Sequence, residues 1–350
     1  MMKRVFQQDI KNPTEELTPE VLKRLMELPR NNQLIDNFRS LKRDMAEAQA
    51  RGAVEEWVKG MTETEDYSKW LSSELKKDER RKEKLVPADN LERVKRYIAQ
   101  KKSSLPAVIP TVTHFAESKD RWGRTGLWRV QSNGYLSGLA VLDADHVPGA
   151  EQLTREWLQR EDFKELGILW MFITPSGEGI KVVFKARMEW GNLQDNAYEM
   201  AERLGVLAYA DGQTKNSDHS HFLSKADDVK FIDWEGLFSY ENPAFEAKYG
   251  EAYRRSDSKP TQPRWQEWER QHEKPQKKTV LPSAAAQTSS TPAAIKFTER
   301  EQAIIKMLNG YTIRFVHTTQ KNLAYKNRLL QMLVFALKDI GKENITDEQP

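Results

Sequence analysis

Two aspartates close an apolar segment in the middle of the chain. Asp143 and Asp145 end the stretch LAVLDAD, residues 139–145. Alternate side chains of a strand share a face, so both carboxylates should lie side by side at the end of a strand. Carboxylates that close repel unless a cation or a proton lies between them, and Mg²⁺ favours carboxylates together with phosphate oxygens and water. The pair predicts a divalent-metal site; the alternative is the ordinary turn chemistry of Asp-x-Asp.

A glycine-rich turn is the second candidate. In MFITPSGEGIKVVF, residues 171–184, Gly177 and Gly179 supply backbone freedom and bare amides, Ser176 supplies a hydroxyl, and Lys181 can face back toward the turn. Such a turn is suited to cradle a phosphate. The alternative is a plain glycine hairpin with a surface lysine.

A third acid follows another apolar segment. VLAYAD, residues 206–211, predicts a strand that ends at Asp211, and a polar loop with Lys215, Asp218, His219 and His221 comes next. The two histidines have the chemistry of metal ligands, but solvated loop histidines are the simpler interpretation. Asp211 as a third acid beside the first two is the more economical hypothesis.

These residues need a scaffold of strands and helices. Residues 12–102 have a helical pattern, with Thr18 as a cap and Pro19 in the first turn. From residue 105, short apolar segments bounded by Gly, Pro, Asn and Asp predict strands at 105–110, 126–131, 136–145, 166–177, 179–188, 206–211 and 221–224. Helical segments at 151–165 and 193–204 interrupt them. We expect an α/β (α+β) fold with a mixed sheet, its core at 103–245 preceded by a helical region at 1–102.

The last part of the sequence has a different composition. Residues 256–296 are rich in Pro, Ser, Thr, Gln and Lys, which predicts a disordered linker because so few apolar side chains cannot form a core. Residues 297–350 resume a helical pattern and predict a small helical unit.

Composition excludes several classes of site. The 350 residues contain no cysteine, which rules out disulfides, thiolate zinc sites and cysteine nucleophiles. The net charge of +3 neither requires nor excludes a nucleic-acid partner. No run approaches the roughly 18 apolar residues of a membrane span. We therefore expect a protein of the cytoplasm, or one made in a host cytoplasm, without a membrane partner.

Three of these segments, in their order, resemble motifs of the archaeo-eukaryotic primase superfamily. Its first motif is an apolar strand ending in Asp-x-Asp, its second reads Ser-Gly-x-Gly-apolar-His or Lys, and its third is an apolar residue followed by Asp; here they read LAVLDAD, SGEGIK and YAD. The closest resemblance is to the primase-like N-terminal domains of mobile-element and phage replication proteins of the virulence-associated-E type. KKSSLPAV, KDRWGR and SGLAVLDAD match further segments of those domains, so the resemblance covers about residues 101–233.

The resemblance implies a DNA replication protein with a primase–polymerase core. Such a nucleotidyltransferase makes primers on single-stranded DNA from nucleoside triphosphates with Mg²⁺ or Mn²⁺, and a replicative helicase is a candidate partner. Carried over by position, the metal-binding catalytic residues are Asp143, Asp145 and Asp211, the nucleotide-binding residues are Ser176, Gly177, Gly179, Lys181 and His219, and the template-binding residues are Arg121, Arg124 and Arg129. Trp122 or Trp128 would be available for base stacking.

One position departs from the family pattern, and two other functions stay open. Related domains carry an arginine where DHSHFLS has His219, and a histidine meets phosphate well only when protonated. LAVLDADHVPG also resembles the first motif of haloacid-dehalogenase phosphatases, with Asp143 as nucleophile, MFITPS as second motif, and Lys225, Asp227 and Asp228 in SKADD. The other alternative is a catalytically inactive primase-like module that binds template or initiates replication.

Overall fold

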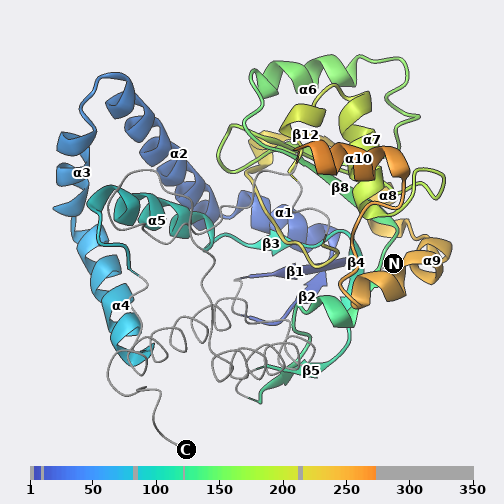
Figure 1. Cartoon of the computed structure of the whole chain (residues 1–350), viewed down its shortest axis with the longest axis horizontal. Coiled ribbons are helices and arrows are strands. Elements are labelled where there is room, and N and C mark those ends of the chain that lie inside the picture. The colour runs from blue at the N-terminus through green and yellow to red at the C-terminus, as the bar shows by residue number, and fades with distance from the viewer. Residues whose placement is uncertain (1–3, 9–11, 82–85, 121–122, 212–215, 273–350) are drawn as a thin grey trace, which may run out of the picture. The chain divides into compact units, whose positions relative to one another are not determined.

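The computed structural model describes residues 4–8, 12–81, 86–120, 123–211 and 216–272, and the side chain of Arg81 is not among them. The chain divides into two compact units, 1–276 and 277–350, and the second lies outside the described residues. The predicted helical unit at 297–350 and residues 273–296 of the predicted linker lie outside the described residues. The mixed α/β class is confirmed for the described residues (Figure 1).

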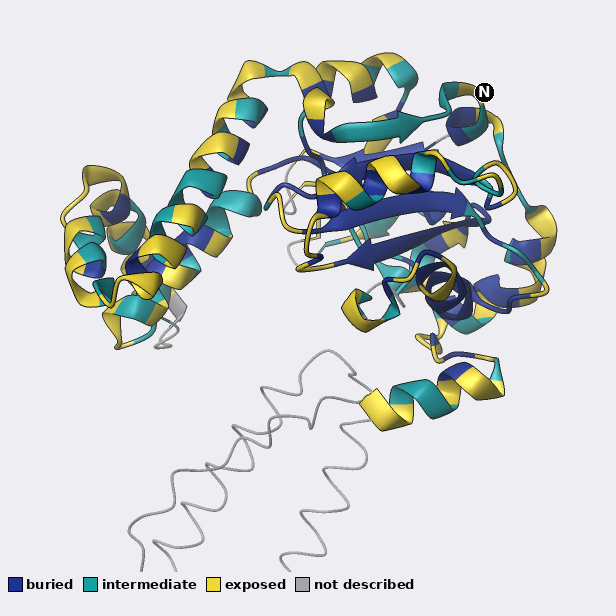
Figure 2. Cartoon of the chain, turned by 90° about the horizontal axis from the view of Figure 1, so that it is seen from above, coloured by how far each residue is buried: buried dark blue, intermediate teal, exposed yellow. Residues whose placement is uncertain are grey.

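A four-stranded antiparallel sheet lies at the centre. Its order is β12-β9-β10-β8, with β8 at Leu139–Ala144, β9 at Ile168–Ile173, β10 at Ile180–Lys185 and β12 at Val229–Ile232. Three of these strands read as almost continuous apolar runs because both of their faces are covered. Figure 2 shows central strands buried over nearly their whole length.

Helices cover one face of this central sheet. Alternate residues of β8, from Ala140 to Ala144, pack in a common core with α6 (Ala150–Leu158), α7 (Leu193–Arg203) and α9 (Pro243–Arg254). This face carries apolar side chains alone along β8, which makes it the main structural core.

The other face meets a second sheet. Its order is β11-β3-β1-β2, with β1 at Arg4–Gln7, β2 at Glu15–Leu17, β3 at Ala107–Val108 and β11 at His221–Phe222. Leu139 and Val141 pack with this sheet, with α1 (Pro19–Glu27) and with α8 (Trp234–Ser239). The prediction of a wholly helical N-terminal region is wrong at β1 and β2, because β1 is buried by pairing with β3 and β2 pairs with β1 at the edge of the sheet.

The helical prediction is confirmed for the rest of the N-terminal region. Thr18 caps α1 by accepting a hydrogen bond from the Val21 amide, and Pro19 is the first helical residue. Four helices follow: α2 (Pro29–Ala50), α3 (Val54–Thr62), α4 (Glu65–Arg81) and α5 (Asn90–Lys102). Phe38, Tyr67 and Tyr97 belong to a separate small core among them.

Two predicted strands are absent from the described residues. VLAYAD forms a 3-10 turn at Leu207–Tyr209, with one bridge between Ala210 and Ala144, because α7 ends at Arg203 and the left-handed backbone of Gly205 (φ 72°) leaves only a short return to β8. Residues 126–131 hold the last residue of β6 (Thr125–Gly126) and the first residue of a 3-10 helix at Gln131–Asn133. Strand β6 pairs with β5 (Ser118–Lys119). A second small sheet joins β4 (Val112–Phe115) to β7 (Gly134–Leu136).

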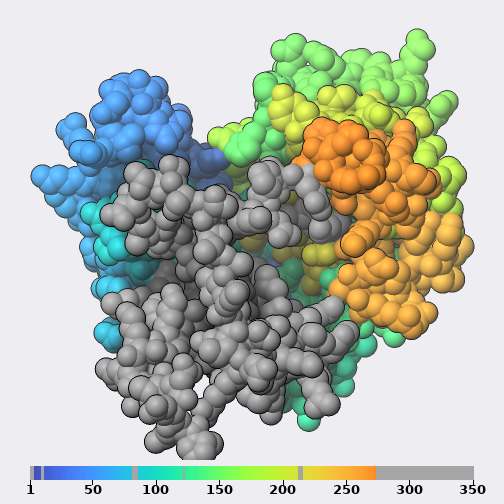
Figure 3. All heavy atoms as spheres, in the orientation of Figure 1, coloured from blue at the N-terminus to red at the C-terminus, as the bar shows by residue number. Residues whose placement is uncertain are grey.

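The beginning of the predicted linker is helical. Helix α10 (Pro263–His272) packs Trp265 and Trp268 against Tyr198 of α7, with ring centroids 5.5 and 4.7 Å apart. Figure 3 shows the outward side of α10 on the surface. The linker prediction is wrong here because the average composition hides a tryptophan pair at helical spacing. No described helix is long and apolar enough to span a membrane.

Candidate functional site

Three charged residues form a row across one end of the central sheet. Lys181 of β10 lies directly opposite Asp143 of β8. On the other side of β8, the amide of Asp211 donates to the Asp143 carbonyl at 2.8 Å, and the amide of Asp145 donates to the Tyr209 carbonyl at 2.9 Å. Residues opposite one another in an antiparallel pair share a face. Lys181, Asp143 and Asp211 therefore share the face that meets the second sheet.

Asp143 and Lys181 form a buried ion pair. Each is 4% exposed, and Lys181 Nζ donates to Asp143 Oδ2. Burial holds the pKa of Lys181 well below its ordinary value, and the charge of Lys102 adds to that effect. Asp143 Oδ1 is buried and has no hydrogen-bond partner among the described residues. A buried ion pair contributes little net stability, so stability alone does not account for this one.

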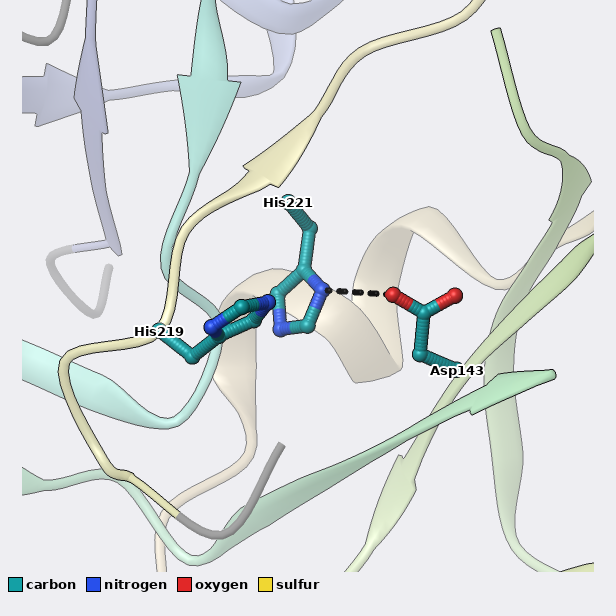
Figure 4. Close-up of side chains that lie close together, drawn as sticks. All are labelled: Asp143, His219 and His221. Atoms are coloured by element: carbon teal, nitrogen blue, oxygen red, sulfur yellow. Dashed lines mark ion pairs between the residues drawn. The ribbon is translucent and has the colours of Figure 1, made fainter. Parts of the chain in front are cut away.

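Two histidines approach the same carboxylate from the second sheet. His221 begins β11 and is 2% exposed, and its Nδ1 lies 4.0 Å from Asp143 Oδ2 (Figure 4). The ring of His219 lies 4.9 Å from that of His221 in an edge-on arrangement. Asp143, His219 and His221 each offer a ligand atom within 4.8 Å of the other two.

The simpler interpretation, solvated loop histidines, is wrong for His221. Pairing of β11 with β3 turns its side chain into the space between the two sheets. The sequence did contain a signal, because the two histidines are only two positions apart, although β11 begins at His221 and its alternation does not extend to His219.

Both imidazoles are held in their neutral form at pH 7. Burial, and next the positive charge of Lys181, lower the pKa of His219 to about 4 and that of His221 well below its ordinary value. A neutral imidazole keeps a lone pair that can bind a metal ion. His219 therefore cannot replace a phosphate-binding arginine at neutral pH.

Other cations surround the row. Burial lowers the pKa of Lys102, the last residue of α5, while the charges of Asp145 and Asp211 oppose that shift. Arg129 Nη1 donates to the carbonyl of Asp218 at 2.8 Å, and its charge helps to lower the pKa of both histidines. Arg129, predicted to bind template, thus lies within electrostatic reach of the two histidines.

The glycine turn joins β9 to β10 beside this row. Gly177 has a left-handed backbone (φ 77°), and a Cβ at Gly179 would lie 2.6 Å from the carbonyl oxygen of Ala144 and 3.2 Å from Asp145 Oδ1. Only glycine allows this approach. Ser176 Oγ lies 2.9 Å from Thr174 Oγ1, so the predicted hydroxyl is engaged within the turn.

Helix α2 holds the turn from outside. Arg39 Nε donates to the Pro175 carbonyl at 3.0 Å, and Arg39 Nη2 donates to the Thr174 carbonyl at 3.1 Å and to Asp228 Oδ2 at 2.8 Å. Lys42 Nζ forms an ion pair with Glu178. The sequence analysis missed both cations, because no local pattern links residues more than 130 positions apart.

The remaining predicted residues lie in different surroundings. Asp145 is exposed just beyond β8 and acts electrostatically on Lys102. Arg124 Nε donates to Asp120 Oδ2 at 2.7 Å, and the Arg124 guanidinium lies 5.0 Å from the ring of Trp128. Arg121, Trp122 and Lys215 lie outside the described residues.

Two of the three residues of SKADD that a phosphatase would use bind side chains of helix α2. Lys225 Nζ lies 2.6 Å from Asp36 Oδ1, and Asp228 binds Arg39 and Ser224. Asp227 is exposed. Lys225 and Asp228 thus fix α2 to the core.

Comparison with known proteins gives a match to a family model. No curated protein and no solved structure matches the chain. A family model described as "BT4734-like, N-terminal domain" matches residues 100–228. The matched range runs from the end of α5 to the residue before β12, and it contains Asp143, Lys181, Asp211 and both histidines. Over that range, the chain is similar to the N-terminal domain of BT4734-like proteins.

Proposed function

We propose that this chain is a primase/polymerase-type nucleotidyltransferase that makes primers on single-stranded DNA for a mobile element or phage. The observation that carries the proposal is the row of Lys181, Asp143 and Asp211 across adjacent backbone segments, with the glycine turn beside it. These residues come from the three segments that resemble primase motifs.

The acidic residues are suited to hold divalent ions. Asp143 has a buried oxygen without a partner among the described residues, Asp211 lies opposite it, and the exposed Asp145 follows at the rim. Asp143, Asp145 and Asp211 would hold Mg²⁺ or Mn²⁺, which supply charge stabilisation for the attacking and leaving oxygens of an in-line displacement.

The cations of the chain would bind and orient the triphosphate. Lys102 lies near Asp145 and Asp211, Arg129 lies near the histidines, and Lys42 lies at the glycine turn. Phosphate oxygens accept hydrogen bonds from such groups, and an arginine can bind two oxygens at once. Lys181 holds Asp143 in place from β10.

Primer synthesis on single-stranded DNA with nucleoside triphosphates and Mg²⁺ or Mn²⁺ tests the proposal. We expect short products from the wild type and none from Asp143→Asn/Asp145→Asn, with Asp227→Asn as the matched control because Asp227 is an exposed acid near the core. A wild type without products, or a double variant as active as the wild type, contradicts the proposal.

The ion pair favours one alternative, an inactive template-binding module. Lys181 already occupies one oxygen of Asp143, as a cation in a disused metal site would. Single-stranded DNA binding without primer synthesis in either metal would support that alternative. Hydrolysis of a generic phosphate ester that depends on Asp143 would instead support a phosphatase.

A further inference from the structure

Several buried polar side-chain atoms have no hydrogen-bond partner among the described residues, and two of them lie together beside the acidic row. These two are Asp143 Oδ1 and His221 Nδ1, on side chains from residues that are 4% and 2% exposed. Buried polar groups are nearly always paired, so two exceptions at one place point to a missing ligand. Figure 4 shows the imidazole of His221 directed toward the Asp143 carboxylate, with His219 beside it.

The three side chains offer a mixed set of donor atoms. One carboxylate oxygen and two imidazole nitrogens lie within 4.8 Å of one another. Imidazole nitrogen suits first-row transition ions, whereas Mg²⁺ favours oxygen ligands and bound water. The separation of 4.0 Å between His221 Nδ1 and Asp143 Oδ2 exceeds the spacing of about 3.4 Å in a tetrahedral site with bonds of about 2.1 Å, so a small side-chain shift closes the site.

We propose that Asp143, His219 and His221 bind one divalent transition ion, of the class of Mn²⁺, Co²⁺ or Zn²⁺, in preference to Mg²⁺. The inference deepens the proposed function by naming the metal class at the inner end of the acidic row. Its catalytic meaning rests on the proposed function, but binding of the ion does not.

Lys181 should compete with the metal ion for Asp143. Its ammonium group lies against Asp143 Oδ2 and supplies the cation that this buried carboxylate needs when no ion is bound. Two cations on one carboxylate repel each other, so the lysine contact and the ion compete. Lys181→Met keeps most of the volume and removes the charge, and it should therefore bind the ion more tightly.

Titration of the full chain with Co²⁺ alone tests the site through the visible absorption of the bound ion. We expect one Co²⁺ per chain that an excess of Mg²⁺ does not displace. His221→Ala and Asp143→Asn should weaken binding more than about 100-fold, beyond the 10–100-fold cost of altering an outer-shell partner. Lys181→Met should strengthen it about tenfold, which corresponds to roughly 1.4 kcal/mol.

The controls keep the test decisive. His114→Ala should bind like the wild type, because His114 is exposed and stacks on Tyr135 with ring centroids 4.5 Å apart. Circular dichroism checks folding, and the partly exposed His219→Gln provides the test if His221→Ala does not fold. Equal Co²⁺ affinity in the wild type and the folded histidine variants, or displacement by equimolar Mg²⁺, overturns the inference.

The Co²⁺-binding test and the primer-synthesis test can fail independently of each other. Primer synthesis by a chain without the specific Co²⁺ site overturns the inference and leaves the function standing. A specific Co²⁺ site in a chain that makes no primers with any metal overturns the function and leaves the site standing.

Discussion

Asp143 and Asp195 are both buried acids, and they differ in how their oxygens are satisfied. Asp195, in the first turn of α7, is 0% exposed and accepts hydrogen bonds from the Asn192 amide, the Thr261 amide and hydroxyl, and the Gln262 amide. Asp143 has Lys181 on one oxygen and no partner among the described residues on the other. A fully satisfied carboxylate indicates a structural joint, whereas an incompletely satisfied one indicates a site for a ligand.

The largest effect that separates the two acids should come from removing both members of the Asp143–Lys181 ion pair. Asp143→Leu/Lys181→Met, which replaces both charges by apolar side chains, should lower primer synthesis by about 10³-fold, because metal-site stabilisation is worth several kcal/mol. Its free energy of unfolding should stay equal or rise, since replacing a whole buried ion pair is often neutral or stabilising. Product gels and urea unfolding measure the two effects. A large loss of stability would place Asp143 with the structural acids.

The converse variant removes the satisfied acid. Asp195→Ala leaves four donors without their acceptor and should lower the free energy of unfolding by about 3 kcal/mol. Helix α10 should loosen with it, because Thr261 and Gln262 lead into that helix. Urea unfolding and limited proteolysis near residue 262 check this. Activity per folded molecule should be unchanged. A loss of activity without a loss of stability would contradict the structural role of Asp195.

Asp228 is a second buried acid with a structural role, and it lies beside the glycine turn. It is 5% exposed and binds Arg39, Ser224 and the Lys225 amide. Arg39→Met should cost about 2 kcal/mol in unfolding free energy, since it removes charged hydrogen bonds to Asp228 and to the turn. Arg43→Met is the control, because the Arg43 side chain is 70% exposed. Equal stability of the two variants would show that α2 does not hold the turn.

The histidines offer a test by pH on the metal-free protein. The pKa of His219 is about 4 in the folded chain, below its unfolded value of about 6.5, so the unfolded state binds more protons between these values. Stability should therefore fall as the pH drops from about 6.5 to 4. His219→Gln should reduce that fall by about 1–2 kcal/mol, allowing for partial exposure, and His114→Gln should not. Unfolding in urea across this pH range, with a chelator present, measures it.

The sequence predicted the parts of the site that depend on strand periodicity. Asp143 belongs to a strand, and the glycine turn is a strand-to-strand connection with Lys181 behind it. These predictions were possible because alternation and turn chemistry are local. Asp211 meets Asp143 through a 3-10 turn and a single bridge, which no strand pattern encodes.

The remaining residues could not be found locally. Arg39 and Lys42 lie on an amphipathic helix whose charged face has many possible partners, and the buried position of His221 depends on pairing between β11 and β3, which are more than 100 residues apart. The tryptophan face of α10 was hidden by averaging over a polar segment. Long-range pairing, not residue type, decided each of these cases.

The attachment of α2 to the core has a mechanical consequence. One helix of 22 residues carries Phe38 in the core it forms with α3, α4 and α5, and it also carries Asp36, Arg39 and Lys42, which bind Lys225, the turn and Glu178. A rigid rod transmits displacement along its whole length. A protein that docks on the helices α3 to α5 and shifts α2 would therefore also shift the turn beside the acidic row, which couples the N-terminal helices mechanically to that end of the sheet.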